Sequence, residues 1–194
     1  KRELTEIAGD EDAIRERFAA SLSFGTAGLR GTLGVGTNRM NIWVVRQATQ
    51  GIADWVKTKG GSQTVAISYD SRLKGWNFAR DAASVLAANG IQVRLYDELM
   101  PVPALSFATR YYNCNAGIMI TASHNPAKYN GYKAYGADGC QVTDEDAAIV
   151  YAAIQKTDVL GGAKFMSFAE GVEKGLIRFV EDACKEAFYA AVES

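Results

Sequence analysis

Histidine, cysteine and net charge are all scarce in this sequence of 194 residues. His124 is the only histidine, so a metal site built from several histidines of this chain is excluded, and any metal would have to use oxygen ligands. The three cysteines, Cys114, Cys140 and Cys184, are an odd number without a CxxC spacing. This argues against a disulfide framework or a zinc cluster and favours a reducing cytoplasm.

Long apolar runs are missing as well. No window approaches the length of a membrane span, and the opening residues KRELTEIAGDED lack the apolar core of a secretory signal. The formal net charge of −1 favours neither nucleic acid nor an anionic membrane as a partner. With 48% hydrophobic and 22% charged residues, the composition is that of a globular protein able to bury a core, and we expect a cytoplasmic location.

Strand-like and helix-like segments alternate through the middle of the chain. Short apolar runs predict buried strands over residues 64–70, 91–97 and 116–123. Apolar residues at helical spacing, with glycine or proline at the ends, predict helices over residues 41–59, 77–89, 104–112 and 144–156. This alternation predicts an α/β fold in which helices sandwich a mixed, largely parallel sheet.

Weaker patterns predict the remaining elements. A helix is expected over residues 11–20, and two short strands are expected around a turn from Gly136 to Gly139. Thr143 and Asp146 resemble a capping box at the start of the helix over residues 144–156.

The glycine pair at positions 161 and 162 suggests a boundary between two parts of the chain. We expect residues 1–160 to form one domain. Residues 161–194 are expected to form a helical linker without a sheet partner, leading to a second domain that is absent from this sequence.

Ser123 is the first residue to suspect of chemistry. The apolar run before it predicts a buried strand, and Pro126 forces a loop to begin. Ligands of open α/β sheets bind at the carboxyl ends of the strands, where this hydroxyl is expected. The alternative is a serine that only makes local hydrogen bonds. A serine hydrolase is disfavoured because GxSxG is absent and because His124, as the adjacent residue of an extended chain, should point away from Ser123.

Hydrogen-bond donors and cations surround this serine in the sequence. His124, Asn125 and Lys133 lie within ten residues of it, and Arg30 could join them if its glycine-rich segment folds over the site. Such a surplus of donors and positive charge is what a phosphate requires. The alternatives are a solvated Arg30 and a strand lysine facing water at position 133.

The glycine-rich segment itself has five glycines in residues 25–36. This density is incompatible with a long helix and suits tight turns and close approach of the backbone to a ligand. The spacing fits neither the Walker pattern nor GxGxxG, so a nucleotide site is not supported.

Three segments together resemble a known family. FGTAGLRG at 24–31, TASHNP at 121–126 and YNGYK at 129–133 are similar, in order and spacing, to signature segments of the α-D-phosphohexomutases. Ala27, where phosphomannomutases commonly have aspartate, makes the chain look most like the phosphoglucomutase and phosphopentomutase branch. The resemblance covers essentially the whole chain, as the first of four domains and the linker into the second.

The resemblance implies a function and a set of roles. It implies an intramolecular phosphotransferase that interconverts the 1- and 6-phosphates of a hexose, with glucose phosphate favoured, through a phosphoserine at Ser123 and a bisphosphorylated intermediate. Lys133 would transfer protons, and Arg30, His124 and Asn125 would bind phosphate and substrate. The alternatives are a phosphopentomutase, a phosphomannomutase or a non-catalytic phosphosugar-binding module.

A magnesium ion belongs to the same resemblance. It would bridge the phosphoserine oxygen at Ser123 and the aspartates of a DGDxDR-type loop. That loop, and the loop that would recognise the sugar, do not occur in these 194 residues. We therefore expect the chain to need the remaining domains of a longer protein and to catalyse little alone.

Overall fold

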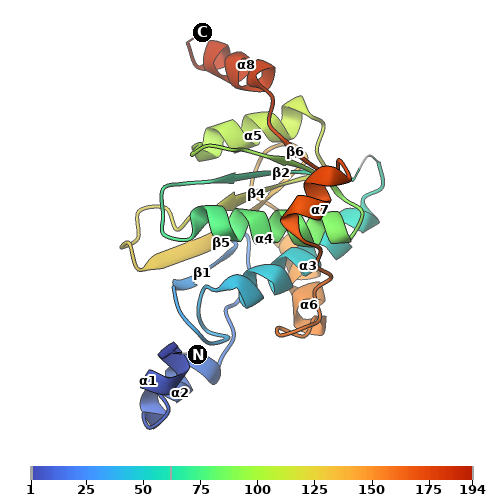
Figure 1. Cartoon of the computed structure of the whole chain (residues 1–194). Helices are drawn as coiled ribbons and strands as arrows, with labels where there is room; N and C mark the ends of the chain where they lie inside the picture. The colour runs from blue at the N-terminus through green and yellow to red at the C-terminus, as the bar shows by residue number, and fades with distance from the viewer. Residues whose placement is uncertain (1, 62, 194) are drawn as a thin grey trace.

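A six-stranded sheet runs through the centre of the computed structural model, which describes residues 2–61 and 63–193 (Figure 1). The strand order is β1-β5-β4-β2-β3-β6, and β5 is antiparallel to both of its neighbours whereas the pairs β4–β2, β2–β3 and β3–β6 are parallel. The strands are β1 Leu29–Thr32, β2 Thr64–Tyr69, β3 Gln92–Leu95, β4 Ala116–Ile120, β5 Tyr129–Gly136 and β6 Ile177–Phe179. The predicted mixed, largely parallel sheet is confirmed.

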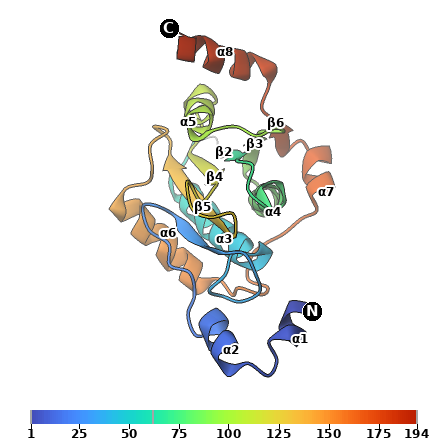
Figure 2. The ribbon, with the colours of Figure 1, turned by 90° about the vertical axis from the view of Figure 1, so that its left-hand side faces the viewer.

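Helices cover both faces of this sheet, as Figures 1 and 2 show. The helices are α1 Arg2–Glu6, α2 Glu11–Phe18, α3 Ile42–Thr58, α4 Gly75–Ala88, α5 Val102–Tyr111, α6 Asp144–Lys156, α7 Phe168–Glu173 and α8 Asp182–Glu193. Helices α3, α4, α6 and α7 pack on one face and α5 and α8 on the other, so β2 and β4 are buried at every position. None of the described helices is long and apolar enough to cross a membrane.

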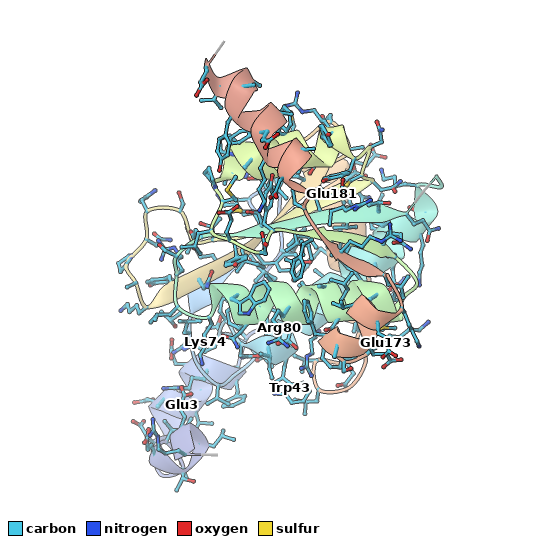
Figure 3. All side chains as sticks on the ribbon, turned by 45° about the horizontal axis from the view of Figure 1, so that its top comes forward. Glu3, Trp43, Lys74, Arg80, Glu173 and Glu181 are labelled. Carbon is cyan, nitrogen blue, oxygen red and sulfur yellow. The ribbon has the colours of Figure 1, made fainter. Side chains whose placement is uncertain are left out.

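The outer side of the larger helical layer faces solvent. Figure 3 labels Trp43 on α3 and Arg80 on α4, both on exposed positions of this layer. The inner sides of α3 and α4 carry the large buried residues, including Trp55 and Leu86. The helical spacing in the sequence therefore identified the core-facing side correctly.

The turn and cap expected around residues 136–146 are only partly formed. Gln141 makes an isolated bridge to Tyr135 and does not belong to a second strand. Thr143 caps α6 by accepting a hydrogen bond from the backbone N–H of Asp146 at 3.2 Å. The Asp146 carboxylate instead accepts from Trp55 Nε1 at 2.9 Å and Lys59 Nζ at 2.7 Å, so it joins α6 to α3 and does not close the reciprocal half of a capping box.

The segment after residue 160 does have a sheet partner, so the expectation that it has none is wrong. Strand β6 pairs in parallel with β3 at the edge of the sheet, with Ile177 opposite Val93 and buried. Residues 177–179 form only three strand positions, of which one is buried, and so short a strand leaves no alternating pattern in the sequence. The proposed division at residue 160 remains a prediction.

The first two helices form an arm that projects from the sheet, at the opposite end of the molecule from α8 (Figures 1 and 2). Neither α1 nor α2 contains a buried residue, and Phe18 at the end of α2 is 42% exposed. Ion pairs fix the arm: Glu3, labelled in Figure 3, pairs with Arg17, and Glu16 pairs with Arg39 of the glycine-rich segment. The chain continues from this arm into residues 21–23, which lie next to the candidate site.

Candidate active site

Pairing of β1 with β5 brings Arg30 and Lys133 to the same face of the sheet. Leu29 lies opposite Tyr132, and both are buried in the core beneath α3. Because neighbouring residues of a strand point to opposite faces, Arg30 and Lys133 project from the other face. Gly131, the register partner of Arg30, has no side chain there, and a Cβ would lie 2.5 Å from the Thr121 carbonyl oxygen. The strand register thus places two cations beside the end of β4.

Ser123 lies just beyond the carboxyl end of β4 in a left-handed backbone conformation, with φ 58°. This conformation is uncommon for a residue with a side chain and is seen mainly where surrounding contacts impose it. One such contact is the backbone N–H of Ser123, which donates to Thr121 Oγ1 at 3.0 Å. The hydroxyl predicted at the end of a strand is therefore held exposed on a tight, structured turn.

A cavity of about 410 Å³ opens at this turn. The described residues that line it are Ser21, Leu22, Ser23, Ala27, Gly28, Leu29, Arg30, Asn38, Thr121, Ser123, His124 and Lys133. Four of the five predicted site residues, all but Asn125, belong to this lining. The lining contains two basic side chains, Arg30 and Lys133, several hydroxyl groups, the Asn38 amide and no carboxylate, and this chemistry favours an anion with several acceptor oxygens.

Asn125 takes part through Arg30. With the Asn125 amide oriented so that its oxygen faces the guanidinium, it accepts from Arg30 Nε at 2.9 Å and from Nη1 at 2.8 Å. The side chain of Arg30 is thereby attached to the loop that carries Ser123. Arg30 is itself an exposed residue, and the Asn125 amide is the partner of its guanidinium.

His124 lies closer to Ser123 than the sequence suggested. Its Nδ1 is 3.4 Å from Ser123 Oγ, because the left-handed turn at Ser123 brings neighbouring side chains to the same side. The expectation that the two side chains diverge assumed an extended backbone and is wrong. The contact is long for a hydrogen bond, and no described carboxylate bonds the His124 ring to complete a hydrolase triad.

The loop of Ser123 is tied to the loop after β2, at the same edge of the sheet (Figure 1). Thr121 Oγ1 donates to the Asp70 carboxylate, and the Arg72 guanidinium donates to carbonyl oxygens of the Ser123 loop. Asn130 is fully buried, and its side-chain amide donates to the Leu73 carbonyl oxygen at 2.9 Å. From the sequence we expect Asp70 and Arg72 at this sheet edge, either bracing the site or, as the safer interpretation, forming an ion-pair scaffold; in the structure both are bonded to this loop.

The described residues do not form a magnesium site by themselves. Within residues 2–61 and 63–193, no group of three or more His, Cys, Asp or Glu side chains could hold a metal ion. Near the cavity the available carboxylate is Asp70, which is already bonded to Thr121 and lies 3.6 Å from Arg72 Nε.

The structure adds site residues that the sequence did not single out. Ser21, Ser23 and Asn38 line the cavity although they lie far from Ser123 in the sequence. Asn38 is held there by a bond from its amide to the Glu16 carbonyl oxygen at 2.9 Å. No local pattern marks these polar residues, because their position depends on how the N-terminal arm packs against the glycine-rich segment.

Comparison with known proteins gives concordant matches. Residues 21–160 match the family described as phosphoglucomutase/phosphomannomutase, alpha/beta/alpha domain I. Phosphoglucomutase of Staphylococcus saprophyticus is 38% identical over 184 residues, which cover 95% of this chain and 33% of that protein. Phosphoglucomutase of Staphylococcus haemolyticus is 46% identical over 132 residues, which cover 68% of this chain and 24% of that protein. The chain thus spans about a quarter to a third of these curated relatives.

A solved structure shares the fold. The crystal structure of a putative phosphomannomutase from Thermus thermophilus superimposes with a TM-score of 0.66 at 30% sequence identity. The match covers 80% of this chain and 35% of that protein. The arrangement of sheet and helices described above is therefore the arrangement of a known domain.

Proposed function

The chain belongs to the phosphoglucomutase/phosphomannomutase family, and we propose on that basis that it is the phosphoserine-bearing domain of a hexose phosphate mutase. The observation that carries the proposal is the position of Ser123. Its exposed hydroxyl lies on a left-handed turn at the mouth of a cavity lined by Arg30, His124 and Lys133, without a carboxylate in the lining. A phosphoryl group on this hydroxyl would add a charge of roughly −1.5 to −2, which Arg30 and Lys133 would neutralise in this proposal.

The proposed reaction moves the phosphoryl group in two opposite transfers. In the first, a hydroxyl oxygen of the hexose monophosphate attacks phosphorus, the bond between phosphorus and Ser123 Oγ breaks, and a bisphosphate forms. In the second, Oγ attacks the other phosphate of the reoriented bisphosphate, and the isomeric monophosphate is released. Phosphoryl transfer of this kind depends mainly on positioning and on stabilisation of charge.

Lys133 and Arg30 have different parts in this proposal. Lys133 carries the proton that leaves the sugar hydroxyl to Oγ in the first transfer and returns it in the second, as one residue can act as base and as acid. Arg30, oriented by the Asn125 amide, holds the phosphoryl oxygens through charge-assisted hydrogen bonds. His124 contacts the serine and the substrate.

A magnesium ion is proposed for the complete mutase, where it would neutralise phosphoryl charge. The oxygen on Ser123 is proposed as its ligand from this domain, and the remaining ligands are proposed to come from other domains of a longer protein, because the described residues hold no group of three or more His, Cys, Asp or Glu side chains that could bind a metal. A cytoplasmic location is proposed as well, since all three cysteines are unpaired.

The preferred substrate is proposed to be glucose phosphate, because the Staphylococcus relatives carry the name phosphoglucomutase. The structural neighbour from Thermus thermophilus carries the name phosphomannomutase, so mannose phosphate is the next candidate to assay. Pentose phosphates complete the comparison, because the FGTAGLRG segment with Ala27 is also similar to phosphopentomutases.

The test uses the full-length protein that contains this domain. After incubation with a hexose 1,6-bisphosphate, peptide mass spectrometry should find one phosphoryl group on Ser123, and Ser123→Ala should lose both that group and mutase activity. Ser71→Ala, a change at an exposed serine of the neighbouring loop, is the matched control and should keep both. A full-length protein without phosphoryl on Ser123 and without activity on glucose, mannose or ribose phosphates would refute the proposal.

Lys133 is tested in the same assay. Lys133→Met should lower turnover about 10²- to 10⁴-fold, the usual contribution of a proton-transferring side chain. Lys128→Met, a change at an exposed lysine outside the cavity lining, should leave turnover within about twofold. Equal turnover of the two variants would remove Lys133 from the mechanism.

A non-catalytic phosphosugar-binding module is the second candidate. The observation in its favour is the lack of a metal-binding group among the described residues. Such a module should bind glucose 6-phosphate in calorimetry while Ser123 of the full-length protein stays unmodified. Phosphoryl uptake on Ser123 decides between the two candidates.

A further inference from the structure

The guanidinium of Arg72 lies behind the loop that carries Ser123 and bonds it at four backbone positions. Nη2 donates to the carbonyl oxygens of Ser123 and Asn125, both at 2.6 Å. Nη1 donates to the carbonyl oxygens of Pro126 at 3.2 Å and Tyr129 at 3.1 Å. All four Nη protons are thus used, and they connect Ser123 with Tyr129, the first residue of β5.

Asp70 fixes the position of this guanidinium. The backbone N–H of Arg72 donates to Asp70 Oδ1 at 3.1 Å, and Asp70 Oδ2 lies 3.6 Å from Arg72 Nε. The same carboxylate accepts a hydrogen bond from Thr121, whose hydroxyl oxygen accepts the backbone N–H of Ser123. The side chain of Arg72 is only 12% exposed, so its place in the fold is well defined. One network therefore holds both sides of the turn at Ser123.

The loop needs donors of this kind. Four carbonyl oxygens converge on this guanidinium, and those of Asn125 and Tyr129 accept at partly buried positions, where backbone carbonyls require hydrogen-bond partners. Ser123 also has φ 58°, a conformation that its side chain disfavours and that persists only when surrounding contacts impose it. A planar guanidinium can donate in several directions at once, whereas a lysine ammonium is a compact charge on a flexible stem.

Arg72 does not line the cavity, so its influence on a ligand has to pass through the loop. We infer that Arg72 is a positioning residue for phosphoryl transfer, which holds Ser123 Oγ at the attacking geometry by bonding the backbone of residues 123–129. The inference rests on the proposed function, since it takes Ser123 to carry the phosphoryl group. A misplacement of a reacting atom by about 1 Å costs on the order of 100-fold in rate.

The experiment compares Arg72→Lys with Arg46→Lys. Arg46 is a matched control because it is also a partly buried arginine in an ion pair, with Nε 2.8 Å from Asp81 Oδ1, and it lies on α3 away from the loop. Amide hydrogen exchange of the chain reports on the loop through the bonded N–H groups of Ser123, Asn125 and Tyr129. Steady-state kinetics of the full-length protein reports on the reaction.

We expect Arg72→Lys to raise exchange at these three amides about tenfold or more while amides within β4, and within β5 after Tyr129, stay protected. Turnover should fall on the order of 100-fold with KM changed less than about threefold. Arg46→Lys should leave loop exchange and turnover within about twofold of the wild type, even if it lowers the melting temperature as much as Arg72→Lys does.

Unchanged loop exchange in Arg72→Lys would overturn the inference, and so would normal turnover despite a loosened loop. A third outcome is that Arg72→Lys raises exchange in the loop but the full-length wild-type protein never acquires a phosphoryl group on Ser123. This outcome would refute the proposed function and, with it, the positioning role of Arg72. It would still show that Arg72 holds the loop in place.

Discussion

Replacing Gly28 by alanine tests how closely the glycine-rich turn is pressed against strand β5. Gly28 has φ +77°, and a Cβ on it would lie 2.0 Å from the Tyr132 carbonyl oxygen and 2.8 Å from Lys133 Cα. Both of these atoms belong to backbone, so no side-chain rotation can make room. Because real Cβ atoms essentially never approach another atom within 3.0 Å, the turn and the strand would have to separate by about 1 Å.

The cost has two parts. A left-handed conformation with a Cβ costs about 1–2 kcal/mol, and forcing an extra methyl group into a packed contact costs about 1–3 kcal/mol. We therefore expect Gly28→Ala to lower the free energy of unfolding by about 2–5 kcal/mol, equivalent to about 4–20 °C in melting temperature for a domain of this size. A shift of about 1 Å at Lys133 should also reduce phosphoryl transfer on the order of 100-fold.

Gly25→Ala is the matched control within the same turn. Gly25 and Gly28 bond each other through their backbones, but a Cβ at Gly25 has no atom within 4 Å. Urea unfolding of the chain should place Gly25→Ala within about 0.5 kcal/mol of the wild type. If both variants unfold at the same urea concentration, or if Gly28→Ala retains full activity in the full-length protein, the tight contact between turn and strand is not what shapes the site.

Two further predictions concern groups away from the cavity. Cys140 is exposed, whereas Cys114 and Cys184 are buried, and burial raises the pKa of the Cys114 thiol to about 12. Ellman's reagent should therefore react quickly with one thiol per native chain and with three thiols in denaturant. A second fast-reacting thiol in the native chain would contradict the packing around α5 and α8. The hydrogen bond from Lys59 holds the pKa of Asp146 below its ordinary value of 3.8, so its stabilising effect is present above that value and is lost as the pH falls through the lowered pKa. Asp146→Asn should therefore be less stable than the wild type by about 1 kcal/mol at pH 7, with a difference in thermal unfolding that narrows as the pH falls below about 4; a constant difference would disprove this role.

Most of the fold could be predicted because its elements carry strong local patterns. Strands β2 and β4 are apolar throughout since helices cover both faces, and α3 and α6 have apolar residues at helical spacing with a cap at Asn41 and Thr143. Strand β6 escaped prediction because three residues pair with β3 only after the chain has returned to the far edge of the sheet. That return depends on α7 packing against α4, which no local pattern encodes.

The candidate site, like the fold, could be predicted from the sequence only in part. The residue types around Ser123, with its cations and its proline-bounded loop, were sufficient to suggest a phosphate, because they are close together in the sequence. The direction of the His124 ring was predicted wrongly, because it depends on a positive φ at Ser123 that the sequence does not reveal.

The sequence by itself determined which chemical groups this domain offers: one exposed hydroxyl at the end of a buried strand, an arginine among glycines and a lysine two residues after Gly131. Local propensity and hydrophobic period suffice for that, since they act over a few neighbouring residues. Only the tertiary structure decided how these groups meet. The register of β1 against β5 puts Arg30 and Lys133 on one face, and the bonds from Arg72 set the turn at Ser123, because both depend on contacts between residues about 50 to 100 positions apart.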